Sequence, residues 1–190
     1  MLSDPLVIAN KNILREAYYD TGMQPVLTVK GYAAVEYRYD RRDRVIREDY
    51  FDEQGYPKLN EEGFASVEVV LDERDNITEK RYLGVDGLPV LNRDNIAVAR
   101  MTYDEENHLV RQQFLDTEEK PVRCKEGYAG VYLSYTEEGL VERERYLDVN
   151  GLMISLADGT AWVEYEYDAI GQVLRILHYD EKGNLLETGQ

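Results

Sequence analysis

Apolar and aromatic residues recur along this chain at a fixed step of 32 residues. The plainest copy runs from residue 32 to residue 63 and reads YAAVEYRYDRRDRVIREDYFDEQGYPKLNEEG. One column of the period holds Tyr18, Tyr50, Tyr82, Phe114, Tyr146 and His178, and another holds Tyr39, Leu71, Tyr103, Tyr135 and Tyr167. A fixed period of this length is typical of repeat architectures, in which each copy folds as one supersecondary unit.

Each copy contains the pattern of an antiparallel hairpin. In AAVEYRY (33–39) apolar or aromatic residues alternate with charged ones, which predicts a half-buried strand. The next turn starts with an acid or threonine, and its fourth place holds Asp43, Asp75, Asn107, Gly139 or Gly171. Aspartate, asparagine and glycine tolerate positive φ, so this turn predicts a bulged hairpin connection. The segment VIREDYF (45–51) is therefore expected to return antiparallel to the first strand.

A second turn of the same type ends the hairpin. It reads DEQG (52–55), DVNG (148–151) and DEKG (180–183), while Gly87 and Glu119 hold the fourth place in two other copies. A short third strand is predicted next, at 25–27, 57–59 and 89–91, because proline is tolerated at a strand start. Alanine opens the first strand of every copy, which suggests the close approach of a neighbouring strand or ring. These alanines are Ala33, Ala65, Ala97, Ala129 and Ala161.

Charge separates two possible arrangements of the copies. In a parallel solenoid, equivalent positions would stack about 4.8 Å apart. Arg111, Arg143 and Arg175 would then form a like-charge ladder, which is destabilising. In an antiparallel meander of three-strand units the equivalent residues lie three strands apart, roughly 14 Å, where salt largely screens them. The meander is also what the hairpin turns require.

The predicted fold class is therefore all-β, with tandem 32-residue repeats that form an elongated, twisted antiparallel β-meander, a superhelical repeat rod. Leu6, Val7 and Ile8 predict a short apolar strand that fits the repeat poorly, as is typical of a terminal copy. The expected division is a partial repeat or cap at 1–17, five repeats at 18–49, 50–81, 82–113, 114–145 and 146–177, and a second partial repeat or cap at 178–190.

Composition limits the classes of partner. The formal net charge is −16, with 38 acidic and 22 basic residues. Such a field repels nucleic acid and anionic membrane surfaces, so neither is an expected partner. The chain has no apolar run of about 18 residues and begins without the basic start of a signal peptide, so we expect no direct membrane insertion and any export signal to lie outside this chain.

No residue pattern predicts catalysis, a cofactor or a bound metal. The paired carboxylates recur at every turn, so we interpret them as turn-forming residues and expect no enzymatic activity. The segment Asp148–Gly151 resembles part of a calcium loop but lacks the further oxygen ligands and the distal glutamate. His108 and His178 have no catalytic partner in sequence and are expected to be structural. Cys124 stands alone in a loop, so we interpret it as incidental.

Candidate partner-binding residues lie on the outward face of the first strand, where the copies differ most. They are Glu36, Glu68, Arg100, Tyr132 and Glu164. The last copy adds Trp162 at a position that is otherwise small or aliphatic, and Ile176 and Leu177 at positions that are otherwise charged, amide or alanine. These changes indicate either a terminal strand pair covered by the tail or an aromatic contact site for a partner or sugar.

The segment YDAIGQVLRILHYDEKGNLLE (167–187) resembles two successive units of the Rhs/YD-repeat family. The longer phrase YFDxxGxPVLNxxGYAxVxYxYD is similar to repeat tracts appended to bacterial cell-wall glycopolymer polymerases and glycosyltransferases of the teichoic-acid type. The resemblance implies an accessory region that holds product or positions an attached enzymatic domain, with catalysis elsewhere. It also implies a location at the bacterial cell envelope, on a side of the membrane that the sequence does not specify.

Three functional hypotheses follow. The first is a binding or spacer module of a larger envelope protein that contacts an extended cell-wall polymer or a protein partner through many weak sites. The second is a purely architectural segment of a YD-repeat shell or fibre. The third is a carbohydrate- or choline-type module that binds through aromatic faces with nearby carboxylates.

Overall fold

The computed structural model describes residues 2–9 and 12–186, and the chain divides into two compact units between Val98 and Ala99. The first unit contains β1 (Leu2–Ala9), β2 (Asn12–Tyr19), β3 (Ala34–Tyr39), β4 (Val45–Phe51), β5 (Ser66–Leu71) and β6 (Ile77–Leu83). The second contains β8 (Leu109–Leu115), β9 (Gly130–Tyr135), β10 (Val141–Leu147), β11 (Trp162–Tyr167) and β12 (Val173–Tyr179). Strand β7 (Val98–Tyr103) begins at the last residue of the first unit.

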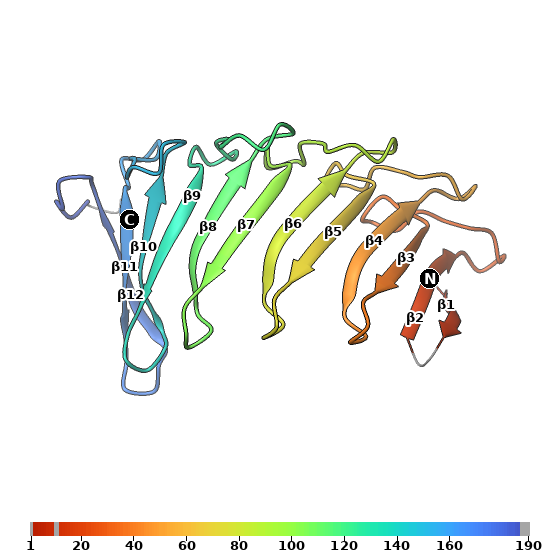
Figure 1. Ribbon diagram of the computed structural model, residues 1–190, viewed down its shortest axis with the longest axis horizontal. Helices are drawn as coiled ribbons and strands as arrows, with labels where there is room; N and C mark the ends of the chain where they lie inside the picture. Colours follow the sequence, from red (N-terminus) through yellow and green to blue (C-terminus); the bar gives the residue numbers. More distant parts are fainter. Residues whose placement is uncertain (1, 10–11, 187–190) are drawn as a thin grey trace. The chain divides into compact units, whose positions relative to one another are not determined.

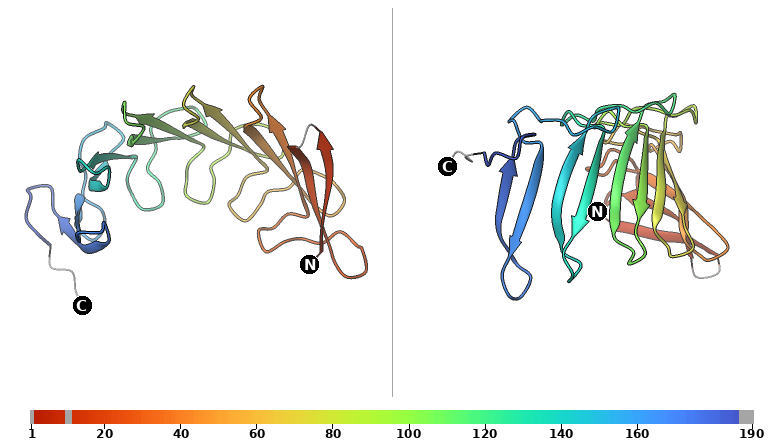
Figure 2. Two further views of the ribbon diagram at one scale, coloured as in Figure 1. Left: turned by 90° about the horizontal axis from the view of Figure 1, so that it is seen from below. Right: turned by 60° about the vertical axis from the view of Figure 1, so that its left-hand side comes forward.

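In both units the strands form an antiparallel meander, which confirms the predicted all-β fold class. Sequential strands are neighbours in the sheet, and the described pairings are antiparallel (Figure 1). In each unit the short hairpin turns lie at one end of the strands and the long connections at the other (Figure 2). The first strands of the hairpins start at residues 34, 66, 98, 130 and 162, in steps of 32. The boundaries of the five repeats and the two caps remain a prediction from the sequence. Within the described ranges there is no helix long and apolar enough to span a membrane.

The turns have the backbone conformation that their residues predict. Asp43, Asp75 and Asn107 have φ of 58°, 70° and 77°, and Gly139 and Gly171 lie in the same region. The hairpin register shifts beside these turns, as expected of a bulged connection. In the first of them Oδ1 of Asp40 accepts hydrogen bonds from the backbone N–H groups of residues 42 and 44, at 2.8 and 3.1 Å.

The predicted third strand is wrong, because the proline segment forms only a single bridge. Phe51 bridges Pro57, and the N–H of Lys58 donates to the carbonyl of Tyr50 at 3.0 Å. The same isolated bridge recurs at Pro25, Pro89 and Pro121. Met153 and Leu185 form the equivalent isolated bridge in two further copies, so the single bridge does not depend on proline. Each repeat therefore holds two strands, and equivalent strands lie two strands apart in the sheet.

The alanine column is buried between neighbouring hairpins, which confirms the expected close approach. Ala33 donates its N–H to the carbonyl of Phe51 at 2.8 Å and accepts from the N–H of Tyr18 at 2.9 Å. It thus joins the second strand of its own hairpin to the second strand of the preceding one. Ala97 and Ala161 are fully buried, and the other three alanines are 2% exposed. A larger side chain has no space at this position.

The tyrosine of the tyrosine–aspartate pair ties its hairpin to the preceding one. The hydroxyl of Tyr39 donates to the carbonyl of Ile13 at 2.7 Å. Tyr135 donates in the same way to Leu109, and Tyr167 to Val141, at 2.7 and 2.6 Å. The aspartate that follows Tyr39 or Tyr167 accepts hydrogen bonds within the turn. The tyrosine therefore links two hairpins, and the aspartate stabilises the turn of its own hairpin.

Candidate aromatic and acidic binding face

A row of aromatic rings runs across one face of the sheet in the first unit. We call it the aromatic row: Tyr18, Tyr32, Tyr50, Phe64 and Tyr82. Successive ring centroids are 6.0, 4.8, 5.8 and 4.8 Å apart, within the range of favourable edge and tilted contacts. The rings come alternately from the second strand of a hairpin and from the turn before the next first strand. With Val35, they form the core of this unit.

Glutamates accept hydrogen bonds from the tyrosine hydroxyls of the row. Tyr18 donates to Glu16 at 3.1 Å, and Tyr50 donates to Glu48. Burial raises the pKa of Tyr18 to about 12, and the bond to Glu16 adds to this shift. Burial, followed by Glu48, also raises the pKa of Tyr50. Both hydroxyls therefore stay protonated and oriented towards carboxylates at neutral pH.

A groove of about 450 Å³ opens beside the aromatic row. We call it the aromatic–acidic groove; it is lined by Val45, Glu48, Glu62, Phe64, Val67, Val69, Ile77, Lys80, Tyr82, Asn92 and Asp94. The lining contains three carboxylates and one ammonium group, so its net charge is negative. Burial raises the pKa of Tyr82, and Asp94 and Glu62 raise it further. The groove therefore combines two aromatic rings with an acidic rim.

The second unit repeats this chemistry 64 residues further along. Glu62, Tyr82 and Asp94 correspond to Glu126, Tyr146 and Asp158. The rings of Tyr128 and Tyr146 lie 5.0 Å apart, and Phe114 lies 5.7 Å from Tyr128. Burial raises the pKa of Tyr146 to about 12, with smaller contributions from Glu144 and Asp158. Glu144 replaces Lys80, so this second copy is the more acidic of the two.

The glutamates predicted from sequence lie on the other face of the sheet, where they hold neighbouring hairpins together. Successive strand residues point to opposite faces, so Glu36 faces away from Val35 and the aromatic row. In the first unit Glu36 pairs with Arg15 at 3.2 Å and Glu68 pairs with Arg47. In the second unit Glu164 pairs with Arg143 at 3.1 Å. Each pair joins the second strand of one hairpin to the first strand of the next.

The other predicted residues belong to the second unit. Arg100 forms an ion pair with Glu119 at 2.5 Å. Tyr132 is 43% exposed and lies between Arg111 and Arg145 in the strand register. Trp162 stacks on Tyr179 with centroids 3.9 Å apart, and the guanidinium of Arg143 lies 5.4 Å from the Trp162 ring. None of the six candidates lines the aromatic–acidic groove.

The histidines and the cysteine have structural partners. The ring of His108 stacks on Tyr135 at 4.5 Å, and its Nδ1 lies 3.2 Å from Asp104. Nδ1 of His178 lies 3.2 Å from the hydroxyl of Thr160. Cys124 is buried in the turn before Tyr128, and burial raises the pKa of its thiol. Both histidine rings therefore have partners within the fold, and Cys124 is part of the core.

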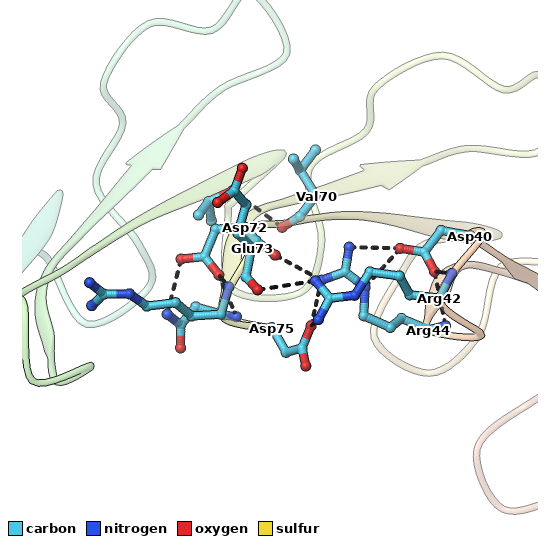
Figure 3. A network of polar contacts seen from close by, with 10 residues as sticks. Asp40, Arg42, Arg44, Val70, Asp72, Glu73 and Asp75 are labelled. Carbon is cyan, nitrogen blue, oxygen red and sulfur yellow. Dashed lines mark hydrogen bonds and ion pairs between the residues drawn. The ribbon is translucent and has the colours of Figure 1, made fainter.

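An arginine network between successive hairpin turns could not be seen in the sequence pattern. Arg44 donates to Asp40 and to Asp75, both at 2.7 Å, and Arg42 lies 3.1 Å from Asp75 (Figure 3). Hydrogen bonding from Arg44 is the main reason that the pKa of Asp40 falls to about 2. Asn12 makes the same connection to Asp43 one repeat earlier, at 2.8 Å. In both connections the acceptor lies 31 residues after the donor, one less than the period. Comparing equivalent positions 32 residues apart therefore does not reveal these pairs.

Comparison with known proteins does not assign a family. No family model and no curated protein matches the chain. Among solved structures, it is similar to a chain of the crystal structure of TcdB2-TccC3-Cdc42, with 11% sequence identity and a TM-score of 0.39. The match covers 93% of this chain and 9% of that chain. A likeness at this TM-score supports no conclusion about function, and the proposals below rest on contacts within this chain. The antiparallel meander itself fits the repeat organisation expected from the YD-type resemblance.

Raising the pH from about 10 to about 12 is expected to unfold the protein progressively. The usual tyrosine pKa is about 10, whereas Tyr18, Tyr146 and Tyr165 have a pKa raised to about 12, mainly by burial. A raised folded-state pKa stabilises the protein fully below the unfolded-state pKa, and this contribution is lost as pH rises towards the folded-state value. Urea midpoints measured across this range should fall while tyrosinate absorbance rises. Tyrosines that all ionise near pH 10 in a folded protein would contradict the expectation.

Proposed function

We propose that this chain is a non-catalytic binding and spacer module of a larger bacterial cell-envelope protein, and that it holds an extended polymer through the aromatic–acidic groove and the equivalent rings and acids of the second unit. The fold is a repeat module of antiparallel hairpins. An attached enzymatic domain would carry the catalysis. The alternative ligand is a protein partner that binds through an extended, basic segment.

The observation that carries this proposal is the repetition of one groove chemistry in both units. Phe64 and Tyr82 stand beside Glu62 and Asp94 in the first unit, and the equivalent rings and acids recur in the second. Equivalent rings and acids at two places on one chain suit a ligand that itself repeats. Binding at one site raises the effective concentration of the ligand at the other, so weak contacts combine into useful avidity.

Charge restricts the kind of polymer. The chain carries −16, and the groove has three carboxylates against one lysine. An anionic polymer would be repelled, whereas ammonium groups would be attracted by the carboxylates and by the faces of the aromatic rings. The proposed ligand is therefore a neutral or ammonium-bearing envelope polymer, such as a glycan with free amino groups. The proposal thus combines the carbohydrate hypothesis with the polymer hypothesis.

A purely architectural role is the second candidate, and the opposite face favours it. Glu36, Glu68 and Glu164 each form an ion pair with the preceding hairpin, so this face contributes cohesion between repeats. An architectural segment needs that cohesion but has no need of an open acidic groove. Binding measurements separate the two candidates.

Calorimetric titration with a glucosamine oligomer bearing free, protonated amines is expected to show binding, and its fully acetylated counterpart should bind more weakly. The double variant Glu62→Gln, Asp94→Asn removes two of the three groove carboxylates and should weaken binding about tenfold, equivalent to ~1.4 kcal/mol. Glu61→Gln is the matched control, because Glu61 is exposed, adjacent in sequence and outside the groove lining. Absence of binding to both oligomers would favour the architectural role. An equal loss in the control would place the binding surface elsewhere.

A further inference from the structure

The second strand of each hairpin pairs with the first strand of the next hairpin over a short stretch of residues, which we call the window. In the junctions β2–β3, β4–β5, β8–β9 and β10–β11, the ladder consists of three residue pairs in one register. The window residues are 15–17, 47–49, 111–113 and 143–145. The equivalent window on β12 is Arg175, Ile176 and Leu177. Strand β12 is the last in the sheet order, so this window has no strand partner among the described residues.

The side chains of β12 differ from those of an ordinary protected edge. Edge strands are usually blunted by charged residues that prevent pairing with another chain. Ile176 is 47% exposed at a position that holds Glu48 and Glu144 in other copies, and Leu174 is 63% exposed. An exposed aliphatic edge with open backbone groups favours the addition of another strand.

Arg175 indicates which residue the added strand should carry. Three of the four arginines that begin the other windows, Arg15, Arg47 and Arg143, pair with a glutamate on the next hairpin. The fourth, Arg111, lies opposite Tyr132. Arg175 instead bonds Glu166 within its own hairpin, with Nε 2.6 Å from the carboxylate, and its side chain is 67% exposed. The window is therefore complementary to a strand with an acidic residue opposite Arg175.

Strand β1 has the register that this window requires. Leu2, Ser3 and Asp4 pair with Tyr19, Tyr18 and Ala17, just as Ala34, Val35 and Glu36 pair with Phe51, Tyr50 and Asp49. Asp4 thus holds the register position of Glu36. Strand β1 is the first in the sheet order, so its outer edge also has no strand partner in the described part of the chain.

We propose that β12 of one copy pairs with β1 of a second copy, head to tail. In the register of the internal junctions, Arg175 lies opposite Asp4 of the second copy, and Leu177 lies opposite its Leu2. Pro5 follows the three-residue segment and lacks an N–H, which keeps the ladder as short as the internal ones. This contact is heterologous, so it joins copies head to tail into chains or rings and not into a two-fold dimer.

The contact is weak and depends on ionic strength. Three residue pairs bury much less area than a stable interface requires. Each copy carries −16, so repulsion between copies opposes the contact at low salt, and screening at high salt relieves it. The inference is independent of the proposed polymer ligand, because it concerns the sheet edge and not the groove.

Sedimentation of the full chain at rising protein and salt concentration tests the contact. The average mass is expected to rise continuously above 22.1 kDa and to pass twice that value. Ile176→Glu should lower the association constant at least tenfold, and Arg175→Asp should do the same. Ile170→Glu is the matched control, because Ile170 is 78% exposed in the turn before β12 but lies outside the window. Its association should be unchanged.

A charge exchange identifies the partner strand. Asp4→Arg alone should weaken association, and combining it with Arg175→Asp should restore it. A mass that stops at two copies and does not respond to Asp4→Arg would show β12 pairing with β12, which overturns the head-to-tail contact. A mass of 22.1 kDa under all conditions, or an Ile176→Glu variant that associates like the original chain, would also overturn it.

Discussion

Replacing Phe64 by alanine is expected to lower the free energy of unfolding of the first unit by about 3–5 kcal/mol, the usual cost for a buried phenylalanine. Phe64 is 8% exposed and lies between the rings of Tyr50 and Tyr82. Its loss interrupts the aromatic row in the middle. A typical domain is stable by only about 5–15 kcal/mol, so this single change should leave much of the first unit unfolded in mild denaturant.

Urea unfolding followed by circular dichroism measures this effect. The control is Tyr56→Ala, which also removes an aromatic ring but from a turn position that is 69% exposed. That variant should stay within about 0.5 kcal/mol of the original chain, as is usual for surface substitutions. If both variants lose the same stability, the aromatic row is not the core of the unit.

The hairpins could be predicted from the sequence because their determinants are local. The residue at the fourth place of a turn must accept positive φ, and Asp43, Asn107 and Gly171 each do so. Even Glu119, a less suitable residue, has φ of 61° at the equivalent place of the second turn. The alanine column also carried a readable signal, because only a small side chain fits between two backbones. Local backbone chemistry and a strict period together determine these features.

Contacts between repeats were harder to predict, because they depend on residues that the period brings together at other offsets. Tyr32 and Phe64 come from turns, and only the fold interleaves them with Tyr50 and Tyr82. The sequence signal for these two rings was their position, because each directly precedes a buried alanine, Ala33 or Ala65. The third turn, in which Asn60 accepts from two backbone N–H groups, resembles the other turns but starts with an amide.

The position of the outward glutamates changes their interpretation. Variation between copies suggested that Glu36 and Glu68 contact a partner, whereas in the structure each has an arginine on the adjacent strand. Residues in such pairs can change together from copy to copy without any ligand. The groove on the other face has carboxylates near aromatic rings. Glu48 comes from β4, whereas Glu62 and Asp94 come from the long connections, where sequence alone gave no geometric constraint.

Replacing Asp49 by alanine is expected to cost about 3 kcal/mol, at the lower end for a broken buried ion pair. Asp49 is 8% exposed and accepts hydrogen bonds from Arg47 at 2.8 Å and from Ser66 at 2.6 Å. Burial alone would raise the pKa of Asp49, but the bonds from Arg47 and Ser66 outweigh burial and lower it. A lowered folded-state pKa stabilises the protein above the usual carboxyl pKa of about 4, and this contribution is lost as pH falls through the folded-state value. The difference between variant and original chain should therefore shrink in acid.

Two companion variants show whether the buried charge is responsible. Glu36→Gln removes a carboxylate from the same face, but its pair with Arg15 is about 40% exposed on both sides, so the expected cost is below about 1 kcal/mol. Replacing both Arg47 and Asp49 by leucine removes both buried charges together and should recover most of the stability lost in Asp49→Ala, since apolar pairs often substitute for buried ion pairs at no cost. Urea midpoints at neutral pH compare the three variants. A double variant less stable than Asp49→Ala would mean that Arg47 stabilises the sheet mainly through Glu68, and the loss should then be reproduced by Glu68→Gln.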